Sequence, residues 1–387
     1  MSNDEQEPVM HAEVVFNRFV TPQADKAIFH IRLNLSQALA YQPGDWLMVT
    51  PHNPSGLVTA CLQALNLSDT TSVTLPRHEP MPLGEALHAH LELTQLQPAV
   101  LNKLQRHFGW SLWPDRQAMM AYAQGRDVLD LIDDLLAQQP ELAEPDQARD
   151  FVTLLAPLAP RFYSIASAPE AVGETEVDLL YRQVVYERAR RQRYGAASNV
   201  LSGSEPGDRL EVEWNLNPHF KLPEDQPDSE ADASTPIVMI GAGTGLAPYL
   251  GFLQRRFGAH ATSTAQQAWL FFGETHADQT DLLAATLPQS MLASWQQLGL
   301  KVSKAFSRDQ AHKVYVQDRI WEARDTLMQW LDQGAYVYLC GDQSKMAPEV
   351  TQCFTSVLEQ VGGQTPDQAA ATWKHWRQIK RVQYDVY

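Results

Sequence analysis

The sequence predicts a β-barrel followed by an α/β domain. Three observations support this prediction: early segments alternate between apolar and polar residues, a long segment with helical spacing interrupts them, and strands alternate with helices after about residue 235. We therefore expect an antiparallel barrel with a helical insertion, followed by a doubly wound parallel sheet with helices on both faces.

Length and composition bound this architecture. The chain has 387 residues, of which 44% are hydrophobic, so it can bury a sizeable core and is expected to form roughly two or three domains. Its formal charge of −16 opposes nonspecific binding to nucleic acid or to anionic lipid. Any anionic ligand must therefore be held by local cations.

The sequence shows no sign of a membrane segment or a metal site. No apolar run approaches the roughly 20 residues that span a bilayer, and the polar residues 1–5 do not form a secretion signal. We therefore expect a cytoplasmic protein. The cysteines, Cys61, Cys340 and Cys353, are too scattered for a disulfide framework or a structural zinc site, so no metal is expected.

The barrel strands are expected in several separate stretches. Residues 11–51 alternate in polarity, with a turn at Gln42–Asp45 before the apolar Trp46–Val49, and helical spacing then covers residues 55–150. Strand patterns return further along the chain, at Phe162–Ile165, Val177–Tyr186 and Asp208–Trp214. The predicted barrel domain is thus 11–223 with its insertion at 55–150, after a disordered tail at 1–10.

A polar, acidic segment separates this domain from the next. Residues 224–235 lack periodic apolar positions and are predicted to form a flexible linker. The second domain, 236–387, alternates strands with helices, which is typical of a parallel sheet. Its expected elements are Ile237–Ile240, Pro248–Phe257, Ala268–Phe272, Lys301–Phe306, Ile320–Leu331, Tyr336–Leu339 and Ala347–Val361.

The segment Arg161–Ser164 offers a cation, aromatic faces and a hydroxyl on one short strand. An arginine can bind pyrophosphate oxygens, a tyrosine can stack on an isoalloxazine ring, and a serine can hydrogen-bond the ring nitrogen that receives hydride. A flavin nucleotide needs all of these contacts. The alternative is an ordinary strand with a surface arginine and a half-buried tyrosine.

A glycine-rich segment follows the first strand of the second domain. In Gly241-Ala242-Gly243-Thr244-Gly245 the glycines would let backbone N–H groups approach a pyrophosphate at the start of a helix. The third glycine comes one residue too early for the standard dinucleotide fingerprint. We therefore expect the loop to hold its ligand differently, with a ligand-free turn as the alternative.

Two signals disagree about the nicotinamide nucleotide. Glu274, at the end of the next strand, could bind a ribose hydroxyl and favour NADH. Cations, hydroxyls and an aromatic ring gather after the following strand, as a 2′-phosphate beside an adenine requires. These residues are Ser307, Arg308, Lys313, Tyr315 and Gln317. The second signal favours NADPH, unless Arg308 and Lys313 are only solvated charges.

Further candidates are weaker when taken alone. Gly195–Ser198 precedes a helix and could bring backbone amides onto the flavin pyrophosphate, although it also reads as a plain helix cap. Cys340 ends an apolar strand, where open parallel sheets bind ligands, but a lone thiol is more often packing. Tyr387 is an aromatic at the last position, where a frayed tail is usual.

Taken in order, these motifs resemble the ferredoxin-NADP reductase module of the diflavin reductases, most closely that of the NADPH-sulfite reductase flavoproteins. The resemblance covers nearly the whole chain. It runs through the motifs Tyr41–Asp45, Arg161–Ser167, Gly241–Pro248, Ser307–Gln310, Lys313–Asp318 and Cys340–Asp342 to the terminus.

This resemblance implies a ferredoxin reductase-like fold, with an FAD-binding barrel and a Rossmann-like NADP-binding sheet. It implies FAD contacts at Thr94, Arg161, Phe162, Tyr163, Ser164, Tyr186, Gly195, Ala196, Ala197, Ser198 and Tyr387. It implies NADPH contacts at Gly241, Gly243, Thr244, Gly245, Ser307, Arg308, Lys313, Tyr315 and Gln317. Ser164, Cys340 and Asp385 would surround the hydride path, and Tyr387 would cover the flavin ring.

The implied function is an FAD-dependent reductase that takes hydride from NADPH and passes single electrons to an external protein. The acceptor would be a flavodoxin or FMN protein, or a haem protein such as the sulfite reductase haemoprotein. The family's FMN domain is not expected in this chain, where only a short polar tail precedes the reductase module, and a family aspartate after the Cys340–Asp342 motif is replaced by Glu349. The alternative function is a non-catalytic, flavin-binding interaction subunit of a redox complex.

Overall fold

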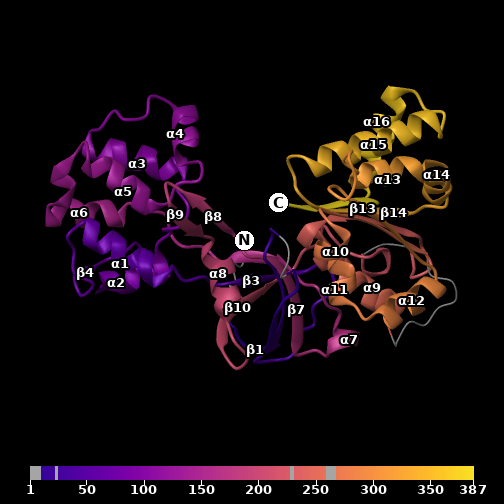
Figure 1. The fold of residues 1–387 in the computed structure, drawn as a ribbon, viewed down its shortest axis with the longest axis horizontal. Coiled ribbons are helices and arrows are strands. Elements are labelled where there is room, and N and C mark those ends of the chain that lie inside the picture. Colours follow the sequence, from indigo (N-terminus) through magenta and orange to yellow (C-terminus); the bar gives the residue numbers. More distant parts are fainter. Residues whose placement is uncertain (1–9, 22–24, 227–230, 259–266) are drawn as a thin grey trace, which may run out of the picture. The chain divides into compact units, whose positions relative to one another are not determined.

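The computed structural model describes residues 10–21, 25–226, 231–258 and 267–387. Residues 1–9 of the predicted tail and residues 227–230 of the predicted linker lie outside this description. The chain contacts divide into two compact units (Figure 1). The first comprises Met1–Met48, Phe162–Arg182 and Glu205–Tyr387, and the second comprises Val49–Arg161 and Gln183–Ser204.

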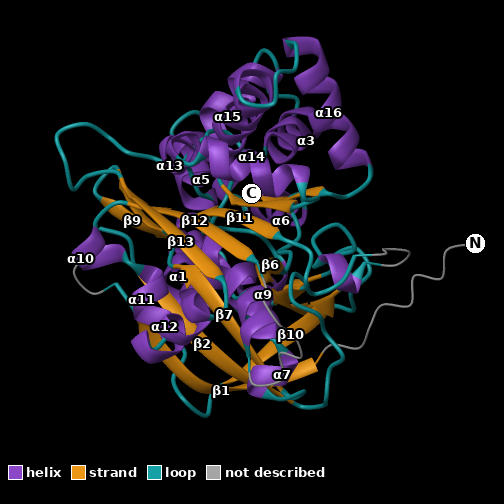
Figure 2. Ribbon diagram, turned by 90° about the vertical axis from the view of Figure 1, so that its right-hand side faces the viewer, coloured by secondary structure: helices purple, strands orange, loops and turns teal. Residues whose placement is uncertain are grey.

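The first unit contains the predicted barrel. Its strands are β1 (Met10–Phe19), β2 (Ile28–Leu35), β3 (Trp46–Val49), β6 (Arg161–Ser164), β7 (Glu176–Arg182) and β10 (Arg209–Asn215). They form a 6-stranded sheet in the order β6-β3-β10-β1-β2-β7. Most of these strands are labelled in the lower part of Figure 2. A bridge between Ile165 and Leu179 joins the two ends of this order, so the sheet is nearly closed. Alternate residues of β1 are buried, as the sequence pattern predicts.

A buried carboxylate fixes the turn that introduces β3. Asp45 accepts hydrogen bonds from the Trp214 indole at 3.2 Å and from the Asn217 backbone N–H at 2.8 Å, and its Oδ1 lies 2.5 Å from Lys221 Nζ. Burial lowers the pKa of Lys221, and the Asp45 charge opposes that effect. Because these bonds satisfy Asp45, the strand that carries Trp46 begins at a defined place.

The second unit packs helices around one apolar core. Its elements are α1 (Ser55–Ala64), β4 (Ser72–Val73), β5 (Met81–Pro82), α2 (Leu83–Glu85), a π-helical turn η1 (Ala86–His90), α3 (Pro98–Phe108), α4 (Arg116–Ala123), α5 (Val128–Leu136), a 3₁₀ turn η2 (Pro140–Ala143), α6 (Pro145–Thr153), β8 (Val185–Arg188), β9 (Arg191–Tyr194) and α8 (Ala196–Gly203). Asp127 caps α5 and also pairs with Arg191 at 2.7 Å, which ties the β8–β9 hairpin to the helices.

The first unit also contains a parallel sheet. Within the described residues its order is β13-β12-β11-β14-β15, and each neighbouring pair is parallel. The strands are β11 (Ile237–Ala242), β12 (Ala268–Glu274), β13 (Leu300–Phe306), β14 (Tyr336–Gly341) and β15 (Val382–Val386). The predicted fold class, an antiparallel barrel with a doubly wound sheet, is confirmed.

Helices cover both faces of this sheet (Figure 1). On one face lie α9 (Ala247–Phe257), α10 (Ala277–Thr280), α11 (Leu282–Thr286) and α12 (Gln289–Gln297). On the other lie α13 (Val316–Glu322), α14 (Arg324–Asp332), α15 (Met346–Gln360) and α16 (Pro366–Gln378). The short α7 (Pro169–Val172) and the 3₁₀ turns η3 (Pro223–Asp225) and η4 (Gly243–Leu246) complete the described elements.

The structure divides two elements that the sequence pattern predicts as continuous. The expected strand Val177–Tyr186 ends at Arg182 and resumes as β8, and the expected helix Ile320–Leu331 is interrupted at Ala323. Each end of the predicted linker is held by an arginine of α9: Arg256 bonds the Glu224 carboxylate and the carbonyl oxygens of Ala233 and Thr235. No helix in the described part of the chain has the length and apolar character to span a membrane.

Candidate functional site

Three predicted site residues meet at one carboxylate. Asp385 lies on β15, directly opposite Cys340 in the parallel register with β14, and Ser164 ends β6. The Ser164 hydroxyl donates to Asp385 Oδ2 at 2.6 Å, and the Cys340 thiol donates to the same oxygen at 3.8 Å. Residues separated by more than two hundred positions in sequence are thus brought into one constellation, because β15 adds to the sheet beside β14.

Trp46 completes this constellation, and sequence reasoning missed it. Its indole N–H donates to Asp385 Oδ1 at 3.1 Å. Asp385 is only 8% exposed, and burial raises its pKa while the bonds from Ser164, Trp46 and Cys340 oppose that rise. The only signal in the sequence was the position of Trp46 directly after the turn at Gln42–Asp45. Nothing there indicated a contact with the far end of the chain.

The thiol of Cys340 is enclosed. The residue is fully buried, and burial, followed by the neighbouring Asp385, raises the pKa of the thiol well above its usual value. Its backbone is equally confined, because a Cβ added at Gly245 would lie 2.2 Å from the Cys340 carbonyl oxygen. The glycine loop therefore packs directly on the end of β14.

The glycine loop carries the features that its sequence predicts. Gly243 has a φ of +58°, a left-handed conformation that favours glycine, and it starts the 3₁₀ turn η4 that leads into α9. The Thr244 hydroxyl lies 2.9 Å from the Tyr387 hydroxyl. Gly241 is also crowded, since a Cβ there would meet the Gly245 carbonyl oxygen at 2.9 Å. The early third glycine thus serves packing against β14.

Tyr387 lies beside the ends of the parallel strands. Its backbone N–H donates to the Gly341 carbonyl at 3.1 Å, and its carbonyl accepts from the Gln343 N–H at 3.1 Å. The residue as a whole is 65% exposed, while burial raises the pKa of its phenol. The last residue is therefore anchored through its backbone, and its hydroxyl lies against the glycine loop.

The aromatic residues of β6 differ in their surroundings. Phe162 is 56% exposed and meets the Trp46 ring edge-on at a centroid distance of 5.5 Å. Tyr163 is half-buried and meets Tyr181 edge-on at 6.2 Å. A planar ligand could therefore contact β6 without disturbing the core.

In the second unit, a shared carboxylate joins Arg161 and Thr94. Glu92 is 2% exposed; one of its oxygens accepts the Thr94 hydroxyl at 2.7 Å and the Thr94 N–H at 2.8 Å, while the other pairs with the Arg161 guanidinium. Sequence reasoning named Arg161 and Thr94 but missed Glu92, which orients both. A lone glutamate in a helical segment carries no such signal.

The start of α8 is built from small buried residues. Ala196 and Ala197 are buried, and the Ser198 hydroxyl accepts the Val184 N–H at 3.1 Å and donates to the Gly195 carbonyl at 3.2 Å. A Cβ at Gly195 would meet Val184 and Ser198 at 3.0 Å, so glycine allows this close packing. The first N–H groups of a helix lack intrahelical acceptors and suit an anion.

Tyr186, also in the second unit, lines an open pocket of about 350 Å³. Other lining residues include Gln95, Leu96, Met120 and Gly125. The tyrosine is 36% exposed and so is partly accessible from this pocket.

The predicted phosphate-reading residues follow β13. The backbone N–H groups of Ser307 and Arg308 donate to the carbonyls of Glu274 and Thr275, each at 2.9 Å, which fixes the first residues of this loop. The Arg308 guanidinium is exposed and lies 3.2 Å from the Asp25 carboxylate. An exposed pair of this kind contributes at most about 1 kcal/mol, so a phosphate could displace Asp25.

The remaining predicted contacts lie in the same connection. Lys313 and Tyr315 are exposed, and the Tyr315 N–H donates to Asp318 at 2.7 Å to start α13. Gln317, in the first turn, donates to Glu349 at 2.7 Å. Glu349, which replaces the aspartate of the resembled family, therefore holds a side chain of the predicted nucleotide site.

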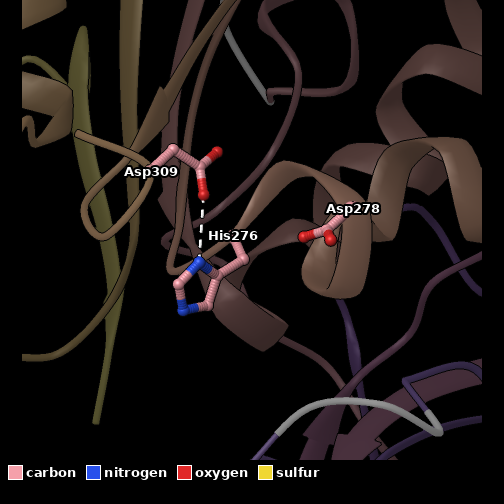
Figure 3. A group of neighbouring side chains, drawn as sticks. All are labelled: His276, Asp278 and Asp309. Carbon is pink, nitrogen blue, oxygen red and sulfur yellow. Dashed lines mark hydrogen bonds and ion pairs between the residues drawn. The ribbon is translucent and has the colours of Figure 1, made fainter.

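A histidine and two aspartates come together near this loop, at a place where the sequence predicted no metal. The ligand atoms of His276, Asp278 and Asp309 lie within 4.8 Å of one another (Figure 3). Asp309 accepts from the Ala277 N–H at 3.0 Å, and its other oxygen lies 3.0 Å from His276 Nδ1. Both oxygens of Asp309 thus join its loop to the loop that carries His276 and Ala277. These contacts explain why the three side chains lie together.

Two family models match parts of the chain, including those that carry Thr94, the glycine loop, Ser307–Gln317 and Cys340. Residues 2–107 match the FAD binding domain, and residues 239–352 match the oxidoreductase NAD-binding domain. This chain is an FAD- and NAD(P)-binding oxidoreductase module. The module is similar in sequence to curated flavoproteins.

Its relatives include the "Sulfite reductase [NADPH] flavoprotein alpha-component" of Shewanella sp. (strain MR-4), 37% identical over 385 residues, which are 97% of this chain and 60% of the relative. The proteins of the same name from Photorhabdus laumondii and Bacillus subtilis are 35% and 36% identical, over 100% and 94% of this chain and 62% and 58% of their own lengths. The module thus spans about 60% of the length of the curated relatives that it matches.

The residues of the module fit its cofactors. The glycine loop joins the end of β11 to η4 and the start of α9, a place where backbone N–H groups can approach a pyrophosphate. Cations stand at the predicted phosphate positions in a protein whose net charge is −16. Tyr163 and Tyr387 have partly exposed rings that suit a flavin.

Proposed function

We propose that this module transfers hydride from NADPH to FAD and then passes single electrons to an external protein. FAD supplies the chemistry that links a two-electron donor to one-electron acceptors. The observation that supports the proposal is the meeting of Ser164, Cys340 and Asp385 beside the glycine loop. A docking module would need none of these contacts.

The chain's own residues contribute mainly positioning. The Ser164 hydroxyl, held by Asp385, would turn towards the flavin as charge develops there, and the Asp385 carboxylate would stabilise the positive charge of the oxidised nicotinamide. Cys340 limits the volume beside them. Trp46 holds the second oxygen of Asp385 and so fixes the orientation of the carboxylate.

The residues that we propose as FAD contacts lie on separate segments of the chain. In the first unit, Phe162, Tyr163, Ser164 and Tyr387 would contact the isoalloxazine ring. In the second, Arg161, Thr94 and the start of α8 would bind the pyrophosphate, and Tyr186 would stack on the adenine. For NADPH, the glycine loop would take the pyrophosphate, while Ser307, Arg308, Lys313, Tyr315 and Gln317 would read the 2′-phosphate and the adenine.

The acceptor we propose is a flavodoxin or FMN protein, or a haem protein. The names of the relatives describe a sulfite reductase flavoprotein, so a sulfite reductase haemoprotein is the first haem protein to test. The net charge of −16 favours an acceptor with a positively charged docking face.

The experiment is anaerobic mixing of the purified FAD-loaded protein with NADPH, followed by addition of candidate acceptors. We expect the flavin absorbance to bleach within seconds and to return when a competent flavodoxin or haem protein is added. Flavin that stays oxidised would reject the reductase function and leave the non-catalytic interaction subunit. Bleaching without reoxidation by any candidate would reject only the proposed acceptors.

A further inference from the structure

Glu274 is a buried acid that the proposed mechanism does not use. It is the last residue of β12, and its carbonyl accepts the Ser307 N–H at 2.9 Å on the β13 side. On the other side, Gly273 is in register with Ala242, the residue before Gly243 of the glycine loop. The Glu274 side chain therefore lies between the predicted 2′-phosphate residues and the predicted pyrophosphate loop.

One oxygen of this carboxylate lacks a partner. Glu274 is 5% exposed, and within the described part of the chain no donor bonds its Oε1. A Cβ added at Gly243 would lie 3.3 Å from that oxygen, so Oε1 faces the glycine loop. An unsatisfied buried acceptor destabilises a protein by about 1–3 kcal/mol. A ligand donor at this position would remove that penalty.

The other oxygen is satisfied. Oε2 accepts the Thr275 N–H at 3.0 Å and lies 3.6 Å from Lys26 Nζ. Burial raises the pKa of Glu274, while Lys26, the Thr275 N–H and the nearby Thr280 hydroxyl act in the opposite direction. These contacts hold the carboxylate in place and keep Oε1 directed at the loop. Oε1 is thus placed to accept a hydrogen bond from a hydroxyl group.

The covalent structure of the nucleotide indicates which hydroxyl this is. In NADPH the adenosine ribose carries the 2′-phosphate on one carbon and the pyrophosphate on another, so it must lie between the groups that bind each. We propose that Glu274 accepts a hydrogen bond from the adenosine ribose 2′-hydroxyl of NADH, and so gives the module a measurable NADH activity beside its NADPH activity. This inference rests on the proposed function.

The charge of Glu274 makes it a determinant of specificity. A carboxylate accepts a hydrogen bond from a 2′-hydroxyl but repels a 2′-phosphate, whereas the Arg308 guanidinium attracts a 2′-phosphate. The positive charge of Lys26, 3.6 Å from Oε2, weakens the repulsion between Glu274 and a 2′-phosphate. Glu274 and Arg308 should therefore shift the preference between NADH and NADPH in opposite directions.

The test compares kcat/KM for flavin reduction with NADH and NADPH in Glu274→Gln and Glu274→Met, with Arg308→Ala as the opposing variant. We expect Glu274→Met to lower the NADH value by about 10- to 100-fold, the usual range for a hydrogen bond to a charged group, with no loss for NADPH. The NADH kcat/KM of Glu274→Gln should lie between the values of Glu274→Met and the wild type. Glu322→Gln, an exposed surface carboxylate, is the matched control.

A binding readout separates this role from structural support. Titration of the FAD-loaded protein with ADP-ribose and with 2′-phospho-ADP-ribose should show that Glu274→Gln weakens only the former. Equal changes in affinity for both probes, or no change for either, would overturn the inference. If Glu274→Met fails to fold, the affinities measured with Glu274→Gln provide the test. Failure of either nucleotide to bleach the unaltered protein would instead reject the proposed function, and the titration would still report on Glu274.

Discussion

At the scale of single residues, the candidate site is organised by carboxylates that sequence patterns describe poorly. The resemblance supplied Ser164, Cys340 and Asp385 together, and the structure brings them within hydrogen-bonding reach. Trp46 and Glu92 were missed because their importance arises from contacts made only after folding. The residue type at one position does not indicate which residue, hundreds of positions away in sequence, it will contact in the folded protein.

The bond from Trp46 predicts a shift in pH dependence. In Trp46→Phe an aromatic ring remains, but Asp385 loses a hydrogen-bond donor that lowers its pKa, so the pKa of Asp385 should rise further. The role we propose for Asp385 requires its ionised form. As the pH is lowered, flavin reduction in the variant should therefore begin to slow at a higher pH than in the wild type. Rapid-mixing measurements between about pH 5 and 8 test this. Superimposable profiles for wild type and variant would contradict it, and Trp110→Phe is the control.

At the scale of elements, the glycine loop shows where sequence reasoning succeeds and where it stops. The position of Gly241–Gly245 between a strand and a helix predicts a nucleotide loop, and the structure places it at the end of β11. The unusual spacing of the third glycine has its explanation in packing, because Gly245 lies against the Cys340 carbonyl. That explanation needs the neighbouring strand β14, which no local pattern reveals.

Gly245→Ala should therefore destabilise the fold. Its new methyl group would overlap the Cys340 carbonyl oxygen, so backbone must move, at a cost of about 2 kcal/mol or more. Urea unfolding followed by circular dichroism measures the change. The matched control is Gly56→Ala in α1, where a Cβ meets nothing within 4 Å and a gain of up to about 1 kcal/mol is expected. Equal stabilities for Gly245→Ala and wild type would contradict the steric argument.

The elements themselves were predictable to different degrees. Strong alternation in β1 and β2 and the regular succession of strands and helices after residue 235 gave the fold class. The break between α13 and α14 was missed because helical residues continue on both sides of Ala323. The strand β15 was missed because it is short and follows a helix, and its place beside β14 is decided by the whole sheet.

At the scale of the whole molecule, an acidic chain must hold anionic nucleotides and control access to them. Tyr387 lies at the ends of the parallel strands. Its hydroxyl is 2.9 Å from the Thr244 hydroxyl, and the residue is largely exposed.

Deletion of Tyr387 should uncover the flavin ring and raise kcat/KM with NADH by about tenfold, equivalent to about 1.4 kcal/mol. Tyr387→Phe keeps the ring and should behave like wild type. Unchanged kinetics with both nucleotides after the deletion would count against the covering role.

Enclosure of the Cys340 sulfur has a chemical consequence beyond shaping a cavity. Reduced flavins that meet dioxygen generate peroxide, and peroxide oxidises thiolates far faster than thiols. Since burial and the adjacent Asp385 keep the proton on this sulfur, it is a poor target for such oxidation. The Cys340 side chain should therefore stay intact when the reduced, FAD-loaded protein is exposed to air without an acceptor.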